Sequence, residues 1–234
     1  MARIFLVEDN EFIREGVAEY FQLEDHEVVE FAGADGVLER MGMTPPDLVI
    51  LDIMLPDGNG FRVARDIRRH SDVPIIFLTA KEAETDRITG FEVGGDDYVV
   101  KPFSTKELVM RAKALLRRSQ PDGSSAAEET SGAWRCGGNR LAIDSQRHEA
   151  RVNDEPLKLT SSEWELLCYL AARPSQVLSR RVLLGECLDY VHDGSTRTVD
   201  THIANLRNKL GNPDWIETVR GYGYRFTGTP DSQS

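Results

Sequence analysis

Cysteine is scarce in this chain of 234 residues. The three cysteines, Cys136, Cys168 and Cys187, are scattered and show neither the spacing of a zinc site nor that of a disulfide framework. This argues against a small secreted protein held together by disulfides and indicates reduced thiols. We therefore expect a cytoplasmic protein.

Long apolar runs and net positive charge are also lacking. No apolar stretch reaches the roughly 18 residues that a membrane span needs, and Met1-Ala2-Arg3 leads into a strand pattern rather than a signal peptide. We expect no membrane partner. The formal net charge of −11 argues against non-specific binding of nucleic acid by the whole chain.

The acidic excess is confined to one part of the chain. Residues 1–118 hold 15 basic and 23 acidic residues, whereas residues 133–234 hold 13 of each. Between them, residues 119–132 have no large apolar side chain and are rich in turn formers, as in a flexible linker of about 20 Å r.m.s. span. We predict a domain over 1–118, a linker over 119–132 and a second domain over 133–229.

Four apolar runs in the first domain have the composition of strands covered on both faces. They are Ile4–Val7, Leu48–Asp52, Pro74–Leu78 and Asp97–Val100. Helical patterns alternate with them, the first one carrying Phe12, Val17, Ala18 and Phe21. This alternation is typical of a parallel sheet.

Polar residues stand at the C-terminal ends of these four runs: Asp52 ends its run, and Glu8 and Asp9, Thr79 and Lys101 follow theirs. In a parallel sheet they converge at one edge, where such sheets bind ligands. Three carboxylates repel one another unless a cation is present, and Mg²⁺ (or Mn²⁺) binds carboxylates together with phosphate oxygens. A solvated strand end explains any one of these residues, but not five at once. The pattern predicts a metal and phosphoryl site with Asp52 as nucleophile, and with Lys101 and Thr79 on phosphate oxygens.

At this point the chain resembles a known family. Glu8-Asp9, Leu51–Pro56, Leu78–Ala80 and Lys101–Phe103 are similar to the receiver domain of two-component response regulators. The resemblance implies an α/β fold, a flavodoxin-like doubly wound parallel five-stranded sheet of strand order 2-1-3-4-5. It also implies phosphorylation of Asp52 by a cognate sensor histidine kinase.

The resemblance further implies roles for single residues. Asp9, Asp52 and the backbone carbonyl of Met54 would bind Mg²⁺, with Glu8 helping through water. Thr79 and Tyr98 would be the switch pair. A phosphatase of the related hydrolase superfamily would need a second aspartate two residues after the nucleophile, and Met54 stands there. Any enzymatic activity is expected to be limited to self-phosphorylation and slow self-dephosphorylation.

The second domain has a different pattern. Strand-like runs at Arg140–Asp144, Glu149–Val152 and Pro156–Leu159 precede three helical patterns, and a hairpin of Trp215–Val219 with Gly223–Phe226 follows them. The helices are expected from a Thr160/Glu163 capping box to Ala172, from Arg180 to Cys187 and from Thr196 to Leu210. This order predicts an α+β winged helix-turn-helix domain.

The third of these helices has one apolar face, formed by Val199, Ile203, Leu206 and Leu210. Its other face is small, polar and partly basic, which suits a DNA major groove and equally suits an ordinary surface helix. Arg197–Ile203 and Thr218–Phe226 resemble the effector domains of OmpR/PhoB-type regulators. The resemblance implies a recognition helix and a wing, with DNA contacts from Arg197, Thr198, Thr201, Asn205, Arg207, Asn208, Lys209, Arg220 and Tyr222.

One departure concerns Ala204 and Asn205, where relatives often carry Arg or Lys. Fewer cations mean fewer phosphate contacts and a shallower salt dependence. His202 is expected to pack or cap locally rather than bind a metal.

The resemblance also implies a homodimer on phosphorylation. Its interface residues would be Arg87, Ile88, Phe91, Asp96, Asp97, Glu107, Val109, Arg111 and Arg118. Arg87 would pair with Glu107, Asp97 with Arg111 and Asp96 with Arg118 of the partner, around an apolar centre that includes Val109. We expect promoter DNA with tandem repeats as a partner, and RNA polymerase through residues 188–195. The alternative is a receiver whose second domain docks a protein instead of DNA.

Overall fold

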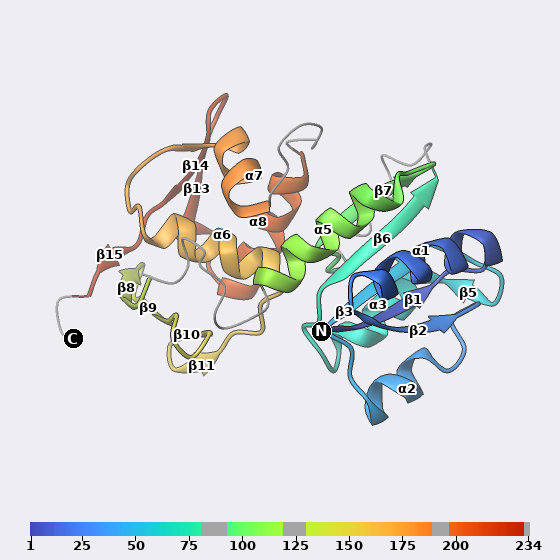
Figure 1. The fold of residues 1–234 in the computed structure, drawn as a ribbon. Coiled ribbons are helices and arrows are strands. Elements are labelled where there is room, and N and C mark those ends of the chain that lie inside the picture. The colour runs from blue at the N-terminus through green and yellow to red at the C-terminus, as the bar shows by residue number, and fades with distance from the viewer. Residues whose placement is uncertain (81–92, 119–129, 189–196, 232–234) are drawn as a thin grey trace. The chain divides into compact units, whose positions relative to one another are not determined.

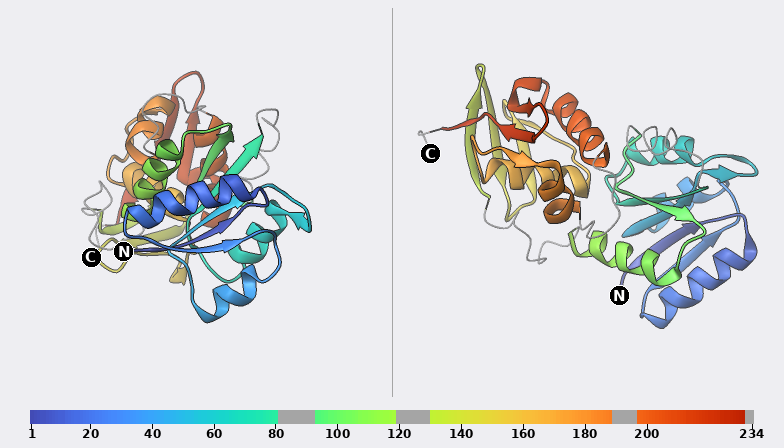
Figure 2. Two further views of the ribbon diagram at one scale, coloured as in Figure 1. Left: turned by 45° about the vertical axis from the view of Figure 1, so that its right-hand side comes forward. Right: turned by 90° about the horizontal axis from the view of Figure 1, so that it is seen from above.

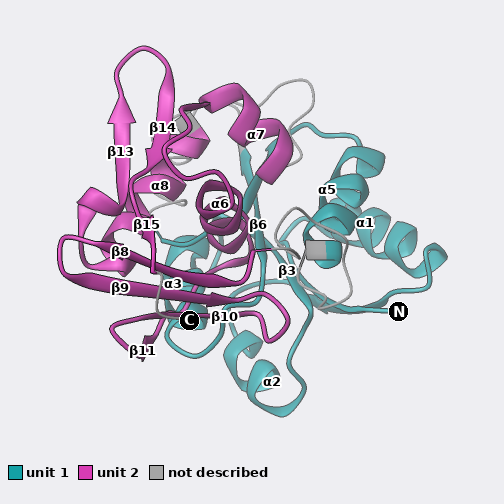
Figure 3. Ribbon diagram, turned by 90° about the vertical axis from the view of Figure 1, so that its left-hand side faces the viewer, with its two compact units in different colours: residues 1–119 teal, residues 120–234 magenta. Residues whose placement is uncertain are grey.

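The computed structural model describes residues 1–80, 93–118, 130–188 and 197–231. Its chain divides into two compact units, residues 1–119 and 120–234, and each is described by itself (Figure 3). Most of the predicted linker lies outside the described residues, so the three-part division stays a prediction. At its far end Gly132, which we assigned to the linker, begins a strand.

The first unit contains a five-stranded sheet in the order β2-β1-β3-β6-β7, with every neighbouring pair parallel (Figure 1). Its strands are β1 (Arg3–Val7), β2 (Glu27–Phe31), β3 (Leu48–Asp52), β6 (Ile75–Ala80) and β7 (Asp97–Lys101). A two-stranded hairpin, β4 (Met54–Leu55) with β5 (Gly58–Asn59), follows β3 and is not hydrogen-bonded into this sheet as a strand. Counted within the large sheet, the order is 2-1-3-4-5, which confirms the expected doubly wound topology.

Helices cover both faces of this sheet (Figures 1 and 2). The first face carries α1 (Glu11–Leu23) and α5 (Thr105–Arg118), and the opposite face carries α2 (Val37–Met43) and α3 (Gly60–Arg68). Along β1, Ile4 and Leu6 pack on the first face while Phe5 and Val7 pack on the other. A strand buried on both sides must be apolar throughout, which explains the unbroken apolar runs.

The predicted first helix is present as α1 and contains all four of the apolar residues on which it was based. Val17, Ala18 and Phe21 form its buried face, whereas Phe12 is 87% exposed. Phe12 precedes Phe21 by nine residues, which at 100° per residue puts the two on opposite sides of the helix.

The second unit combines helices with two antiparallel sheets, in the orders β11-β10-β9-β8-β15 and β12-β14-β13. The strands are β8 (Gly132–Cys136), β9 (Asn139–Asp144), β10 (Glu149–Val152), β11 (Glu155–Pro156), β12 (Leu178–Ser179), β13 (Ile216–Val219), β14 (Gly223–Phe226) and β15 (Thr229–Pro230). Helices α6 (Ser161–Ala171), α7 (Arg180–Leu188) and α8 (Arg197–Leu210) pack against a core that includes the stacked rings of Trp215 and Phe226. Strands, three helices and a terminal hairpin make the expected winged helix-turn-helix.

Some strand boundaries differ from those predicted. The run Pro156–Leu159 is a strand only at its first residue, because β11 ends at Pro156. The Leu157 N–H still donates to the Ala150 carbonyl of β10, and the side chains of Leu157 and Leu159 pack half-buried against the core. Trp215 ends a 3₁₀ turn (Pro213–Trp215), which Asn212 caps, and the strand begins one residue later. Within the described ranges no helix is both long and apolar enough to cross a bilayer.

Candidate functional site

Four neighbouring strands bring the polar residues of the first unit to one edge of its sheet. Glu8 directly follows β1, Asp52 ends β3, Thr79 is the last residue but one of β6, and Lys101 ends β7. Because β1, β3, β6 and β7 are adjacent and parallel, these residues share the carboxyl edge. The convergence predicted from the sequence is present.

Three carboxylates form the acidic part of this edge. Glu8, Asp9 and Asp52 each offer an oxygen, and these oxygens lie within 4.8 Å of one another. Glu8 and Asp52 are buried, while Asp9 is exposed. Burial is the main cause that raises the pKa of Glu8. Clustered oxygen donors with one open side suit a hard divalent cation.

Lys101 lies between two of these acids. Its Nζ is 2.6 Å from Oδ2 of Asp52 and 2.6 Å from Oε2 of Glu8. Burial acts to lower the pKa of Lys101, but the hydrogen bonds to Asp52 and Glu8 outweigh it and raise that pKa. The ammonium is therefore charged and in place to contact any group bound to Asp52.

The backbone after Asp52 turns sharply back. The Met54 N–H donates to Oδ1 of Asp52 (3.0 Å), and the Gly60 N–H donates to the carbonyl of Ile53 (3.0 Å). A Cβ at Gly60 would lie 2.2 Å from the carbonyl oxygen of Asp52, so only glycine fits there. This close return puts the β4–β5 hairpin directly beside the acidic cluster.

The two residues expected to form a switch are both inside the fold. Thr79 and Tyr98 are buried, and the ring of Tyr98 lies 5.2 Å from that of Phe77. Tyr98 belongs to the core cluster on the α2/α3 face. In this structure the tyrosine thus occupies an inward position.

Arg14 is a residue of this edge that the sequence analysis missed. Its Nη1 donates to the backbone carbonyls of Glu8 (2.8 Å) and Asp9 (3.2 Å), and its Nε is 3.5 Å from Glu30. Side chains on a helix lean toward its N-terminus, so a long cation early in α1 can reach back to the preceding loop. That geometry was the available signal.

In the second unit, α8 presents the two faces that were predicted. Val199, Ile203, Leu206 and Leu210 are buried, as is His202. Ala204 and Asn208 are exposed, and Thr201 and Asn205 are partly exposed. Thr198 is only 2% exposed, which does not suit the direct DNA contact we expected. The side chain of Arg197 lies outside what the structure describes.

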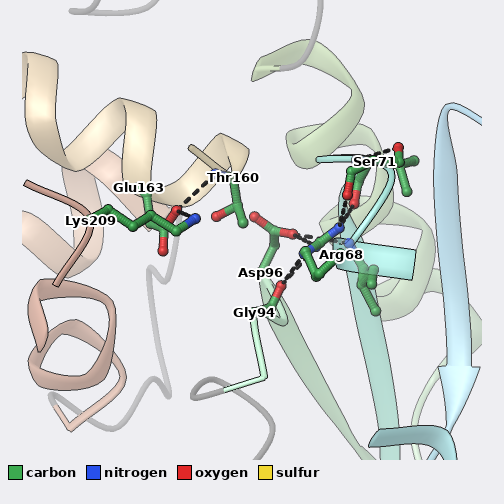
Figure 4. A network of polar contacts seen from close by, with 9 residues as sticks. Arg68, Ser71, Gly94, Asp96, Thr160, Glu163 and Lys209 are labelled. Atoms are coloured by element: carbon green, nitrogen blue, oxygen red, sulfur yellow. Dashed lines mark hydrogen bonds and ion pairs between the residues drawn. The ribbon is translucent and has the colours of Figure 1, made fainter. Parts of the chain in front are cut away.

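Arg207 and Lys209 have partners within the domain. Lys209 Nζ lies 2.5 Å from the buried carboxylate of Glu163, whose same oxygen accepts the Thr160 N–H at 2.8 Å (Figure 4). Arg207 donates to the Ile216 carbonyl and to Oγ1 of Thr218. Both cations therefore tie α8 to other elements, a use that competes with the expected phosphate contacts.

The wing and the start of α8 are joined by a polar contact. Oδ1 of Asp200 accepts from Arg180 Nε and from Tyr224 Oη, each at 2.6 Å. Burial, followed by the bond to Asp200, raises the pKa of Tyr224 to about 12. Beyond this contact Arg220 and Tyr222 are exposed at the turn between β13 and β14, where Gly221 has φ +79°. The side chains at the tip of the wing are therefore accessible for contact with DNA.

The expected dimer residues are only partly described. Arg87, Ile88, Phe91 and the side chain of Arg118 lie outside the described residues. Arg111 pairs with Asp97 and Glu107 of its own chain, and Val109 is buried in the α1/α5 core rather than in an exposed centre.

Asp96 is buried and pairs with Arg68 at 2.9 Å (Figure 4). Arg68 also donates to the carbonyls of Gly94 and Val73. Asp96 thus has a partner within its own chain, beside the intermolecular one that was expected.

Known proteins share both units. Residues 4–113 match the response regulator receiver domain family, and residues 154–226 match the family "Transcriptional regulatory protein, C terminal". The transcriptional regulatory protein SrrA of Staphylococcus aureus is 40% identical over 230 residues, which cover 95% of this chain and 94% of SrrA.

Solved structures agree. A cysteine-to-serine mutant of RitR is 26% identical over 98% of this chain and 100% of that one, with a TM-score of 0.78. Response regulator DrrB, described as a Thermotoga maritima OmpR/PhoB homolog, is 30% identical over 97% and 100%, with a TM-score of 0.51.

A doubly wound domain with an acidic strand-end cluster, followed by a winged helix, defines a class of signal-responsive DNA-binding proteins. The matches over both units place this chain within it. The chain belongs to the response regulator family and is a DNA-binding transcriptional regulator of two-component signalling, of the OmpR/PhoB type. The matches with known proteins give no support to the alternative in which the second domain docks a protein instead of DNA.

Proposed function

We propose that Asp52 is the phosphoacceptor and that a cognate sensor histidine kinase is its donor. The observation that carries this proposal is the surroundings of Asp52: a buried carboxylate at a strand end, clustered with Glu8 and Asp9 and contacted by Lys101. Titratable groups that interact strongly with one another at one place are typical of functional sites.

The donor set fits Mg²⁺ or Mn²⁺. Asp9, Asp52 and the Met54 carbonyl would hold the ion, with Glu8 acting through water. When bound, the ion neutralises the charge of the phosphoryl oxygens.

The chain's own residues then have distinct tasks. A carboxylate oxygen of Asp52 attacks phosphorus while the P–N bond of the kinase phosphohistidine breaks and its imidazole keeps the electron pair. Lys101 moves from Asp52 to a phosphoryl oxygen, and Thr79 donates to another. The inward position of Tyr98 is then favoured, which shifts the population toward the active state. Activity is limited to self-phosphorylation from small donors and slow self-dephosphorylation.

The output we propose is phosphorylation-dependent dimerisation in the cytoplasm, binding to tandem DNA repeats about one helical turn apart, and contact with RNA polymerase. Support comes from the exposed polar residues of α8 and the exposed wing tip. Selection of bound sequences from random DNA tests this output. Enrichment of no sequence by the phosphorylated protein would favour the docking alternative.

The phosphoacceptor is tested with acetyl phosphate and Mg²⁺, followed by intact mass. The parent is expected to gain one phosphoryl group and Asp52→Asn none. Undiminished labelling of Asp52→Asn would overturn the assignment.

A further inference from the structure

The hairpin that follows Asp52 is attached to the fold at both ends. At its base, the Met54 N–H binds Asp52 and the Gly60 N–H binds the Ile53 carbonyl. At its tip is the turn Pro56-Asp57, between β4 and β5. A hairpin this short has almost no stability of its own, so its position depends on these attachments.

Asp57 makes the attachment at the tip. Its Oδ1 accepts the Ala34 N–H at 2.9 Å and its Oδ2 accepts the Asp35 N–H at 3.0 Å. These bonds, the one from Ala34 first, lower the pKa of Asp57. The carboxylate is therefore charged and joins the hairpin to the loop between β2 and α2.

Gly33 makes this approach possible. A Cβ built on Gly33 would lie 2.6 Å and 2.7 Å from the two carboxylate oxygens of Asp57. A larger residue at this position would push the carboxylate away from the two N–H groups. The tether therefore requires both an acid at 57 and a glycine at 33.

We infer that Asp57 is a positioning residue for the metal site. By fixing the tip of the hairpin, it fixes the segment that supplies the Met54 carbonyl to the cation and the Met54 N–H to Asp52. This inference rests on the proposed function, because the cation and the role of Met54 belong to it. Asp57 itself touches neither the cation nor the phosphoryl group.

A simpler reading is that Asp57 only adds negative charge near a cation site. The two readings differ for Gly33→Ala, which removes the tether and keeps every charge. They also differ for Asp66→Ala, a control that removes a partly exposed acid of α3 whose carboxylate pairs with Arg69. If Asp57 positions the metal site, Gly33→Ala should weaken metal binding and Asp66→Ala should not.

The experiment measures Mn²⁺ binding to the full chain by the electron paramagnetic resonance signal of the free ion. Asp57→Ala and Gly33→Ala are expected to raise the dissociation constant about three- to tenfold, at or below the range of partners that orient metal ligands. Asp57→Asn keeps one hydrogen-bond acceptor, so its dissociation constant should lie between those of the parent and Asp57→Ala. At saturating Mg²⁺, the labelling rate by acetyl phosphate should return to within about twofold of the parent, because the tether acts through metal binding.

The outcomes separate the inference from the function on which it rests. If the parent binds no Mn²⁺, the proposed metal site fails. If the parent binds and Asp57→Ala binds equally well, only the positioning role fails. If Asp57→Ala and Asp66→Ala weaken binding alike while Gly33→Ala does not, charge and not position is the cause. Far-UV circular dichroism of each variant, compared at the measuring temperature, shows that the fold is kept.

Discussion

At the scale of the residue, Lys101 is the group whose removal best separates chemistry from signalling. It pairs with both Asp52 and Glu8 in this structure and would contact the phosphoryl group afterwards. Lys101→Ala should keep some labelling by acetyl phosphate, because the attacking carboxylate remains. It should weaken the gain in DNA affinity on phosphorylation. The exposed Lys106→Ala is the control, and a Lys101→Ala variant that responds fully would remove this role.

Tyr224 gives a pH-dependent prediction. Its folded pKa of about 12 lies above the value near 10 of an unfolded chain, so the folded state resists losing this proton. Stability from this group is therefore complete below pH 10 and is lost as pH rises toward 12. By pH 11 the loss is on the order of 1 kcal/mol.

The comparison is with Tyr224→Phe, which has no such proton. At pH 7 the variant should be less stable by about 1 kcal/mol, since the bond to Asp200 is gone. The difference in stability between the parent and Tyr224→Phe should become smaller by pH 11, because only the parent loses the contribution of this proton. Urea unfolding followed by tryptophan fluorescence measures it, because all three tryptophans lie in the second unit. If the difference in the free energy of unfolding between parent and variant does not change with pH, the raised pKa of Tyr224 is contradicted.

The sequence predicted residue identities at this scale better than their contacts. Asp52 and Lys101 were found because strand ends of a parallel sheet must converge. Arg14 and Asp57 were missed because their bonds go to backbone groups of loops. Loop geometry leaves almost no periodic pattern in the sequence.

At the scale of the element, the pair Lys209–Glu163 joins the end of α8 to the start of α6. Lys209→Met would take away the ammonium that lies 2.5 Å from the buried carboxylate of Glu163 and keep the bond from Thr160. We expect the second unit to lose about 1–3 kcal/mol of stability. Exposed Lys158→Met should cost far less. Urea unfolding and the salt dependence of DNA binding are measured together.

If Lys209 is instead a phosphate contact, the salt slope should fall by about one with stability unchanged. Parent-like stability of Lys209→Met would therefore restore the assignment to DNA.

Elements with strong periodicity or caps were predicted well. The apolar spacing of α8 and the Thr160/Glu163 capping box both appear in the structure. β12 and β15 were not predicted because two-residue strands are defined by their partners and not by their own residues. Leu157 and Leu159 alternate like a strand, but of their backbone only the Leu157 N–H pairs with the sheet, at the Ala150 carbonyl.

At the scale of the whole molecule, the charges from residue 86 to 118 bear on assembly. We expect Arg87→Glu to block dimerisation in the presence of beryllofluoride as a phosphoryl mimic, and added Glu107→Arg to restore it in part. A two-fold axis repeats each pair, so bridges worth about 0–1 kcal/mol singly add up. Sedimentation of each variant measures this, and full dimerisation of Arg87→Glu would place the interface elsewhere.

The contacts seen within one chain bear on that test. Within one chain, Arg111 forms ion pairs with Asp97 and Glu107, and Arg68 forms one with Asp96. A partner must therefore share or displace these cations, so assembly should depend on more than the number of opposite charges. No repeat or composition bias could have revealed this competition, because it depends on which neighbours the fold provides.

The ion pairs of Lys101 also bear on how the protein responds to magnesium depletion. The ammonium is an internal counterion for Glu8 and Asp52, so this acidic edge does not depend on an external ion to remain folded. Chelation should therefore silence phosphotransfer while leaving the folded protein intact. Adding the ion back should then restore phosphotransfer without any refolding step.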